Sequence, residues 1–390
     1  MDNNQSGTLK ALEGIKIIDL SRVLAGPFCT MLLGDMGAEV IKVEIPDKGD
    51  DSRSFPPFKE GQGTYFINFN RNKKSIVLDL KKSSDVNKFL EIIKSMDVLV
   101  ENFRPGTMEK MGLGYETIRN VNNQLIYASI SGFGHYGPYK DKPGYDIIGQ
   151  AVGGIMSITG WPDGPPTRTG TAIADILAAL FCTIGILSAL QARTVYGKGQ
   201  KIDVALVDSV VSAIGTILQI YLVEKRIPKR AGNRYDFIAP YEAFKAKDGW
   251  FVLGVGNDNI WKKFCDSIDR KDLINDDRFK TNIKRIKHNK ELAEIIGGLS
   301  ANFTVKEIIS ILEESGVPAA PINNLEQIVN DPHIAIAREM IQKIVHPIAG
   351  EVKITGNPIK MSETNPQIYE SSPLLGEHTD YILNRYVRKK

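Results

Sequence analysis

The chain has 390 residues, enough for two or three domains, and its 42% hydrophobic and 24% charged residues are typical of a globular protein. The net charge of +3, with basic residues spread along the chain, argues against a dedicated nucleic-acid-binding protein. Cys29, Cys182 and Cys265 are far apart and odd in number, which fits neither a disulfide framework nor a zinc site. With a polar start that lacks the apolar core of a secretory signal, this favours a reducing, cytoplasmic setting.

The first part of the chain alternates short apolar runs with helical patterns, which is typical of an α/β fold with a parallel sheet. The predicted strands are Ile15–Leu20, Glu39–Glu44, Ser75–Leu80, Val98–Glu101 and Leu125–Ser131. The predicted helices are Phe28–Met36, with Pro27 at its first position, Asp85–Met96 and Gly144–Met156. The turn Leu24-Ala25-Gly26-Pro27 has one glycine where the dinucleotide fingerprint needs three, so we expect no redox nucleotide domain.

Two loops follow predicted strands, and such loops are where open α/β sheets bind ligands. They are Asn102-Phe103-Arg104 and Ser131–Tyr139. His135 lies in the second loop, where a binding role and an ordinary exposed position both stay open. A basic cluster of Arg71, Lys73 and Lys74 beside a strand is either a solvated edge or a phosphate clamp.

Asp175 lies near the start of a long apolar run, Ile173–Leu190, after a stretch rich in Gly, Pro and Thr. The free N–H groups and the dipole of a first helical turn favour a charged carboxylate, so we expect Asp175 to be ionised at neutral pH, as a nucleophile must be. Aspartate is also a common residue at helix starts for structural reasons alone. Asp146 precedes apolar residues, and it either faces a core with a raised pKa or faces outward.

A second apolar run, Val204–Val223, also approaches the length of a membrane span. Because the two runs carry Asp175 and Asp208, we expect helices buried in a large core or a dimer core, and no membrane span. No His, Cys and Asp cluster has metal-site spacing, so we expect no metal site. No serine has a nucleophile-elbow context, so a serine hydrolase is poorly supported.

The pattern changes after about residue 225, where a smaller α+β region begins. Its predicted strands are Tyr241–Lys245 and Trp250–Val255, joined by a hairpin turn, and its predicted helices are Asn259–Ile268, Asn289–Leu299 and Val305–Ser315. Short strands follow over Met340–Lys360, and a last helix over Glu377–Tyr386.

Several stretches together resemble the family III CoA-transferases, which include formyl-CoA transferase and alpha-methylacyl-CoA racemase. They are Leu12–Leu20, Leu24–Pro27, Gly37–Glu44, Asn72–Ser75, Val100–Gly106, Gly132–Gly134, Gly144–Asp146 and the stretch that ends at Asp175. Three later stretches are similar to the succinyl-CoA:glutarate branch: Pro240–Gly249, Ser315–Asn324 and Pro373–Thr379. Each motif is weak alone, but their order over nearly the whole chain is specific.

The resemblance implies a Rossmann-like large domain over residues 1–224 and a smaller α+β domain over 225–325. It also implies that residues 326–390 return to the large domain, and that two chains interlock as a homodimer. Asp175 falls on the nucleophile of the family, which forms covalent intermediates with acyl groups and with CoA. The implied substrates are an acyl-CoA and a carboxylic acid, with coenzyme A as carrier and neither a metal nor a redox cofactor.

CoA contacts follow from the resemblance position by position: Ala25, Leu78, Lys81, Asn102, Phe103, Lys110, Gly144, Tyr145 and Asp146. This chain departs from formyl-CoA transferase in three places. Leu24 replaces a glutamine, the glycine-rich gating loop is reduced to Ala231-Gly232-Asn233, and a phosphate-binding arginine aligns with Ile45. We therefore expect Lys42 or Lys48 to supply that charge, and we do not expect formyl or oxalyl specificity.

Transfer is favoured over racemisation because Tyr145 stands where racemases of the family have a histidine base, and an unperturbed tyrosine pKa near ~10 makes a poor base. The branch-level resemblance implies succinyl-CoA as the donor and a short dicarboxylate as the acceptor. Arg104 and Arg168 are candidates for binding the distal carboxylate, although either could instead contact CoA phosphate or lie on the surface. A racemase or epimerase and a non-catalytic CoA-binding protein are the alternatives.

Overall fold

The computed structural model describes residues 9–387 and divides into two compact units. The first unit contains the described residues up to Ile155, then Arg168–Glu224 and the chain from Asp331 onward; the second contains Met156–Thr167 and Lys225–Asn330. The predicted domain boundaries after residues 224 and 325 stay a prediction, because compact packing does not show that either part folds alone.

The first unit is built on a six-stranded sheet whose paired strands all run parallel. Its strands are β1 (Lys16–Asp19), β2 (Glu39–Glu44), β5 (Lys73–Val77), β6 (Val98–Glu101), β7 (Ile126–Ser131) and β8 (Lys201–Ala205). The order β5-β2-β1-β6-β7-β8 starts from the middle and extends first to one side and then to the other. In such a doubly wound sheet, ligands bind outside the carboxyl ends of the strands where the direction reverses, here between β1 and β6.

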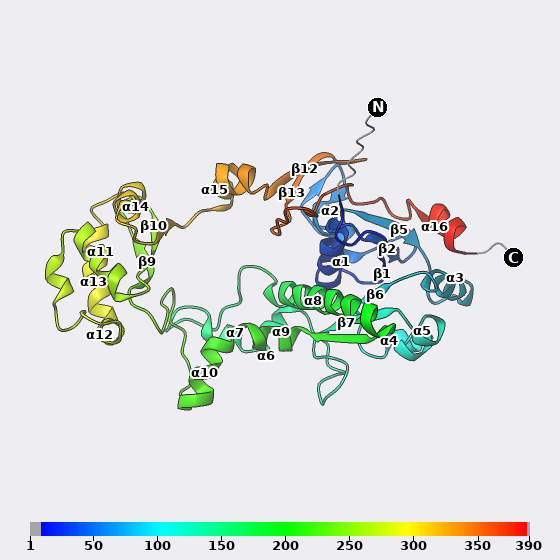
Figure 1. Cartoon of the computed structure of the whole chain (residues 1–390), viewed down its shortest axis with the longest axis horizontal. Helices are drawn as coiled ribbons and strands as arrows, with labels where there is room; N and C mark the ends of the chain where they lie inside the picture. Colours follow the sequence, from blue (N-terminus) through cyan, green and yellow to red (C-terminus); the bar gives the residue numbers. More distant parts are fainter. Residues whose placement is uncertain (1–8, 388–390) are drawn as a thin grey trace. The chain divides into compact units, whose positions relative to one another are not determined.

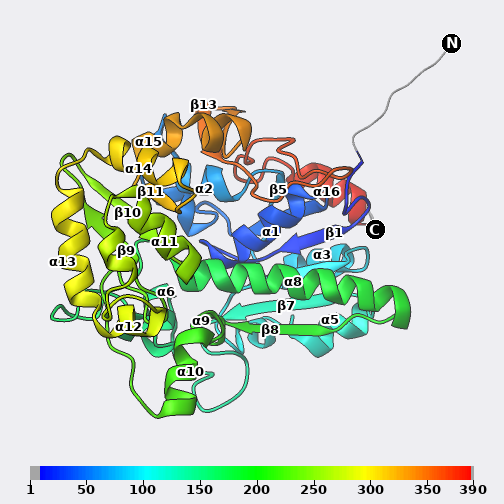
Figure 2. The same ribbon diagram turned by 60° about the vertical axis from the view of Figure 1, so that its left-hand side comes forward.

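Helices cover both faces of this sheet, because alternate side chains of each buried strand point to opposite faces. The long helix α8 (Ile173–Tyr196) lies beside α1 (Ala25–Asp35) on one face (Figure 2), over a core that includes Ile17, Val100 and Ala128. Helices α3 (Ser83–Ile93), α5 (Tyr115–Val121) and α16 (Thr379–Tyr386) pack on the other face, over a core that includes Ile18, Leu99 and Tyr127. Both faces of β1, β6 and β7 are therefore shielded from water.

The remaining elements of the first unit are short. They are η1 (Asp51–Ser54), β3 (Phe58–Lys59), β4 (Gln62–Gly63), α2 (Thr64–Phe69), α4 (Thr107–Lys110), α6 (Asp146–Val152), α9 (Leu206–Ala213), α10 (Gly215–Glu224), the π-helix η3 (Pro332–Ala337), β12 (Ile341–His346) and β13 (Gly350–Thr355). Helix α7 (Ile155–Ile158) crosses the boundary between the units. The last part of the chain packs against β5, where the His378 Nδ1 atom accepts a hydrogen bond from the Ser75 N–H at 3.3 Å.

The second unit holds a three-stranded antiparallel sheet in the order β11-β10-β9, and Figure 2 labels the three strands; Figure 1 shows the helices α11 to α14 of the same unit. Its elements are β9 (Tyr241–Lys245), β10 (Trp250–Gly254), α11 (Asp258–Ser267), η2 (Lys271–Ile274), α12 (Asn282–Lys287), α13 (Asn289–Ser300), α14 (Val305–Glu314), β11 (Ala319–Pro321) and α15 (Leu325–Asn330). Its helices share one apolar core with the sheet, around Phe244, Phe251 and Trp261. Helix α14 begins with a capping box between Thr304 and Glu307.

Three predictions about helices are wrong in detail. Helix α1 begins at Ala25, so Pro27 is its third residue and not its first. The helix predicted over Gly144–Met156 is interrupted at Gly154, where a φ of 90° breaks the α-helical path. The run Val204–Val223 is not one helix: its first residues end strand β8, and α9 and α10 then meet at an angle of 74°.

One long helix of the first unit is apolar enough to resemble a membrane span. By length and composition alone, α8 could cross a membrane, and the described residues hold up to three such spans if two bent helix pairs are counted. In the structure α8 lies along the parallel sheet (Figure 2), with Ala178, Cys182 and Ile186 buried in its core.

Candidate active site

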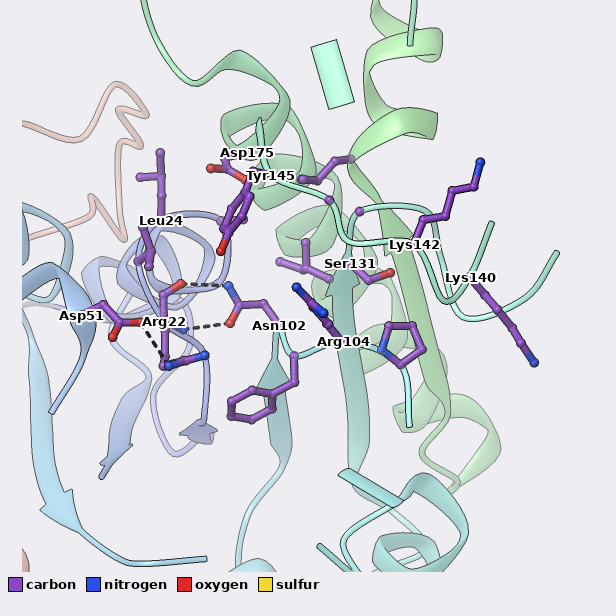
Figure 3. A pocket seen from close by; sticks show the side chains of 18 residues that line it. Arg22, Leu24, Asp51, Asn102, Arg104, Ser131, Lys140, Lys142, Tyr145 and Asp175 are labelled. Atoms are coloured by element: carbon purple, nitrogen blue, oxygen red, sulfur yellow. Dashed lines mark hydrogen bonds and ion pairs between the residues drawn. The ribbon is translucent and has the colours of Figure 1, made fainter. Parts of the chain in front are cut away.

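A cavity of about 200 Å³ lies at the carboxyl ends of β1 and β6, where the sheet reverses its winding. Its walls come from the turn after β1, the turn after β6 and the loop between β7 and α6 (Figure 3). Asp175, in the first turn of α8, reaches the same cavity. The topology of the sheet therefore gathers residues that are more than 150 positions apart in the sequence.

Asn102 joins the turns after β1 and β6. Its Oδ1 atom accepts a hydrogen bond from the Arg22 N–H at 2.8 Å, and its Nδ2 atom donates to the Arg22 carbonyl at 2.8 Å (Figure 3). The next residue, Val23, has a φ of 69°, which is unfavourable for a β-branched side chain. Its N–H donates to Asp50 at 3.1 Å. These contacts hold the backbone that presents Leu24 and Ala25 to the cavity, in a conformation of the strained kind that clusters at functional sites.

Asp146 holds the start of α8, although it lies 29 positions before the nucleophile candidate. Its Oδ1 atom accepts a hydrogen bond from the Ala174 N–H at 2.9 Å, and its Oδ2 atom accepts one from Gln150 at 2.7 Å. The helix has no cap of its own, because Ala172 occupies its N-cap position. Asp146 thus supplies the capping carboxylate and fixes the position of Asp175.

The charge state of Asp175 differs from the sequence-based expectation. Burial, and then the neighbouring carboxylate of Asp146, raise the pKa of Asp175 to about 7. At neutral pH the carboxyl group of the free protein is therefore partly protonated, because desolvation and the like charge outweigh the helix N-terminus. Tyr65 on α2, which the sequence reasoning missed, lies nearby: burial, and the charges of Asp175, Asp50 and Asp146, raise its pKa to about 12, so its phenol stays neutral.

Cationic side chains outnumber carboxylates around the cavity. Arg22, Arg104, Lys140 and Lys142 line it, against Asp51 and Asp175 (Figure 3). Arg22 is neutralised by Asp51 at 3.1 Å, and its guanidinium lies 5.6 Å from the centre of the Phe103 ring. The remaining positive charge favours anionic ligands, such as phosphates or carboxylates.

A second cavity, of about 320 Å³, shares Arg22 and Phe103 with the first. Apolar side chains line much of this cavity. They include Val43 of β2, Leu78 and Leu80 from the chain after β5, and Met111, the residue after α4. Lys81, an exposed lysine, lines the same cavity and places a positive charge beside these apolar side chains. An apolar slot beside a cation suits a flat ring that carries phosphate groups.

The structure brings most of the predicted site residues to these two cavities. Ala25, Asn102, Phe103, Arg104, Gly144, Tyr145 and Asp175 line the first cavity, and Leu78, Lys81 and Phe103 line the second. Lys110, Asp146 and Arg168 line neither, so their predicted contacts with substrate stay predictions. Lys140, Lys142 and Arg22 were not singled out from the sequence, although Ser131–Tyr139, the first part of the loop that carries the two lysines, was.

Three of the predicted phosphate-binding cations are buried and paired with carboxylates. Lys42 is fully buried and lies 2.9 Å from Asp50, so its ammonium is already paired; Lys48 is exposed and does not line the cavity, so its predicted phosphate contact stays a prediction. The suggested phosphate clamp is also internal: Arg71 pairs with Asp35 at 2.7 Å and Lys73 with Asp19 at 3.0 Å. The pairs of Arg71 and Lys73 were not evident from the sequence, because their acidic partners are 36 and 54 positions away.

Within residues 9–387, no group of three or more His, Cys, Asp or Glu side chains is arranged to hold a metal ion. The fold and the site thus define an α/β enzyme that sets a carboxylate beside a cation-rich cavity at the switch point of a parallel sheet.

Residues 12–379 match the family model described as "CoA-transferase family III". The chain is 40% identical to the succinyl-CoA:glutarate CoA-transferase of Mus musculus over 98% of its own length and 87% of the relative. It is 42% identical to the succinyl-CoA:mesaconate CoA-transferase of Haloarcula hispanica over 96% of both chains. A crystal structure of a CAIB/BAIF family protein from Brucella suis superimposes with a TM-score of 0.85 at 37% identity, covering 97% of this chain and 99% of that one. The protein belongs to CoA-transferase family III.

Proposed function

We propose that this enzyme moves CoA from succinyl-CoA to a short dicarboxylic acid, through covalent intermediates on Asp175, as a homodimer. The observation that carries the proposal is the position of Asp175, a carboxylate at the helix start that borders a cavity rich in cations. Relatives named for succinyl-CoA with glutarate, mesaconate or citramalate support the substrate class.

In the proposed reaction the ionised Asp175 carboxylate attacks the thioester carbonyl, and the C–S bond breaks to give a mixed anhydride and CoA thiolate. The thiolate attacks the Asp175 carbonyl of the anhydride, which forms an aspartyl-CoA thioester and releases succinate. The acceptor carboxylate attacks that thioester to form a second anhydride and free thiolate. The thiolate then attacks the acceptor carbonyl, so the new acyl-CoA leaves and the Asp175 carboxylate is regenerated.

The surroundings of Asp175 fit this sequence of steps. Its pKa of about 7 supplies both an ionised fraction at neutral pH and a nucleophile more basic than an exposed aspartate. The cations that line the cavity can stabilise the negative charge that moves between carboxylates and thiolate. Racemisation needs two bases that flank an α-carbon, and Tyr145 occupies the position where the second base is expected.

The first test replaces the nucleophile. Asp175→Asn is expected to lower turnover by roughly a thousandfold or more, while CoA binding stays near that of the wild type. Succinyl-CoA with hydroxylamine should convert Asp175 of the wild type to a hydroxamate, which peptide mass spectrometry detects. Asp380→Asn, another aspartate in the first turn of a helix but exposed, is the matched control. An unmodified Asp175 in an enzyme with full turnover would exclude the covalent mechanism.

The second test concerns the acceptor. A panel of mono- and dicarboxylates with succinyl-CoA, read by mass spectrometry of the CoA esters, should show preferential use of short dicarboxylates. Arg104 lines the cavity whereas Arg168 does not, so Arg104→Ala should raise the acceptor KM roughly tenfold or more and Arg168→Ala by much less. Equal use of monocarboxylates, with an unchanged KM in Arg104→Ala, would refute the dicarboxylate assignment.

Racemisation of a 2-methylacyl-CoA in heavy water without acceptor would point to the racemase alternative.

A further inference from the structure

A group of buried polar side chains lies under the active-site loops, on the face of the sheet opposite α1 and α8. Glu101 on β6, Ser129 on β7 and Asp203 on β8 stand directly opposite one another in the strand register. His135, from the loop after β7, lies over them, and Lys201 of β8 completes the group. We call these five residues the histidine cluster; none of them belongs to the proposed chemistry.

Buried atoms without a hydrogen-bond partner are concentrated in this cluster. In the described part of the chain, nine buried side-chain nitrogen or oxygen atoms lack a partner, and four of them are Glu101 Oε1, Ser129 Oγ, His135 Nε2 and Asp203 Oδ1. Most buried polar groups in proteins are paired, so such a concentration in one place calls for an explanation. Two of the four atoms, Glu101 Oε1 and His135 Nε2, face each other at 3.8 Å.

The geometry determines which ring nitrogen of His135 carries the proton. The Lys201 ammonium lies 3.1 Å from His135 Nδ1, and an ammonium can only donate, so Nδ1 accepts. The hydrogen of the neutral ring is therefore on Nε2 and faces the Glu101 carboxylate. Burial, together with the charge of Lys201, keeps the pKa of His135 below its usual value, so the ring stays neutral near pH 7.

The same side chains connect the walls of the active-site cavity. The backbone N–H of His135 donates to the Asp203 carboxylate at 2.8 Å, which connects the loop to β8. The Phe103 N–H donates to Glu101 Oε2 at 2.8 Å, which ties the turn after β6 to its own strand. Phe103 lines both cavities, and its neighbour Asn102 holds Arg22 after β1. A continuous chain of contacts thus runs from β8 to β1, and the gap between His135 Nε2 and Glu101 Oε1 is its one link longer than a hydrogen bond.

We propose that Glu101 and His135 are positioning residues for the CoA channel: the hydrogen bond between Nε2 and Oε1 closes when the channel is occupied and fixes Phe103 in its binding position. This inference rests on the proposed function only in taking the two cavities to be the CoA channel. The bond requires an ionised Glu101. A proton on Oε1 would place an O–H donor opposite the N–H donor of His135 Nε2, with no acceptor between them.

The proposal predicts a pH dependence of binding. Burial raises the pKa of Glu101 to about 7, so the carboxyl gains a proton as the pH falls through neutrality and the link is lost. Binding should therefore weaken toward pH 6. The other titratable and charged groups that surround the pair are Glu109 of α4, Tyr127 of β7, Lys201 and Asp203 of β8, and Cys182 of α8. The pKa values of Tyr127 and Cys182 are raised, so both stay neutral in this range.

The test measures binding of acetyl-dephospho-CoA by calorimetry between pH 6 and 8. This ligand has neither the 3′-phosphate, which itself titrates near pH ~6, nor a free thiol. The protein carries Asp175→Asn, because the nucleophile would otherwise titrate in the same range. The dissociation constant is expected to rise roughly three- to tenfold from pH 8 to pH 6, as linkage to one group with a pKa near 7 requires. Adding Glu101→Gln should give weak binding that changes less than about twofold over this range.

Two further variants separate positioning from structural support. His135→Gln keeps a donor toward Glu101 and an acceptor toward Lys201, so it should largely retain binding at pH 8, whereas His135→Leu should lose it to the level of Glu101→Gln. Glu116→Gln, an exposed change on α5, is the control that should leave the pH profile unchanged. A flat pH profile in the Asp175→Asn protein would overturn the positioning role while leaving the transferase assignment intact. No binding of acyl-CoA at any pH would instead contradict the proposed function itself.

Discussion

Two buried polar clusters lie on either side of the switch point of the same sheet, and they differ in how completely their groups are paired. We call Asp19, Lys42, Asp50 and Lys73 the lysine cluster. Lys73 lies 3.0 Å from Asp19, and Lys42 lies 2.9 Å from Asp50 and donates to the Ser21 carbonyl at 2.8 Å. In the histidine cluster, by contrast, four polar atoms have no partner.

The difference appears in the charge states. Burial opposes ionisation of Asp19, but Lys73 and Lys42 outweigh it and hold the pKa far below its usual range. Around Glu101 burial prevails, and the pKa rises to about 7. Burial also lowers the pKa of Lys73 to about 8, so each cluster holds a group that titrates near neutral pH. The clusters differ in pairing: the charged groups of the lysine cluster have partners, whereas four polar atoms of the histidine cluster have none.

The largest expected effect comes from breaking the lysine cluster. Asp19→Asn leaves the ammonium groups of Lys73 and Lys42 with one carboxylate fewer, and it should lower the free energy of unfolding by about 3–5 kcal/mol. Urea unfolding followed by far-ultraviolet circular dichroism measures this. The control Glu351→Gln breaks only an exposed pair with Lys343 and should leave the unfolding midpoint unchanged. A loss below about 1 kcal/mol in Asp19→Asn would show that the cluster is not a support of this kind.

A smaller expected effect is a difference between the two clusters in how the free energy of unfolding depends on pH. Between pH 4.5 and 7 the folded chain keeps a proton on Glu101 that the unfolded chain loses, so this residue makes stability fall as the pH rises. The free energy of unfolding should fall by at most about 3 kcal/mol on this account, and the fall should be absent in Glu101→Gln. The variant should therefore become more stable relative to the wild type from pH 5 to pH 8. Asp19 itself adds no pH dependence over that range, because its pKa is lowered and its contribution is lost only in strong acid; any slope in Asp19→Asn comes from Lys73, whose pKa burial lowers to about 8. Parallel pH profiles of wild type and Glu101→Gln would contradict the raised pKa.

The smallest effect compares one substitution in both clusters. The Ser21 hydroxyl donates to Asp19, whereas the buried Ser129 hydroxyl has no partner within hydrogen-bond geometry, although it lies close enough to Glu101 to lower the pKa of that carboxyl group. Ser21→Ala should cost about 1–3 kcal/mol of unfolding free energy, and Ser129→Ala less than about 0.5 kcal/mol. Thermal or urea unfolding at pH 8 measures both. Equal losses would mean that pairing does not distinguish the clusters.

The sequence predicted the strands of the first unit well where apolar runs are continuous and flanked by polar residues. Strand β6 has the predicted bounds because Val98–Val100 is such a run, and β2 has them although Lys42 interrupts its apolar residues. Strand β8 was missed, since its alternating residues lead directly into the apolar helix α9 and the two patterns merge. Helix α2 was missed as well, because six residues give too little periodicity to detect.

For the site, the sequence predicted which loops meet but not the electrostatics. The rule that loops after parallel strands bind ligands placed Asn102 and Phe103 correctly beside the cavity. The pKa of Asp175 could not be predicted, because it depends on burial and on Asp146, which lies 29 positions away and becomes its neighbour only in the fold. The same holds for Lys42 and Lys73, whose acidic partners come from other strands and loops.

The contact between Gly132 and Gly144 affects how this site can diversify. A Cβ atom built on either residue would lie within 2.7 Å of the other's Cα, so the two ends of the intervening loop touch backbone to backbone. A loop closed at its base by glycine can lengthen, shorten or exchange its tip at little entropic cost, without moving the strand and helix that anchor it. Lys140 and Lys142 sit on that tip. The residues between Gly132 and Gly144 can therefore vary in length and in side chains at the edge of the cavity while Asp175 and helix α8 keep their positions.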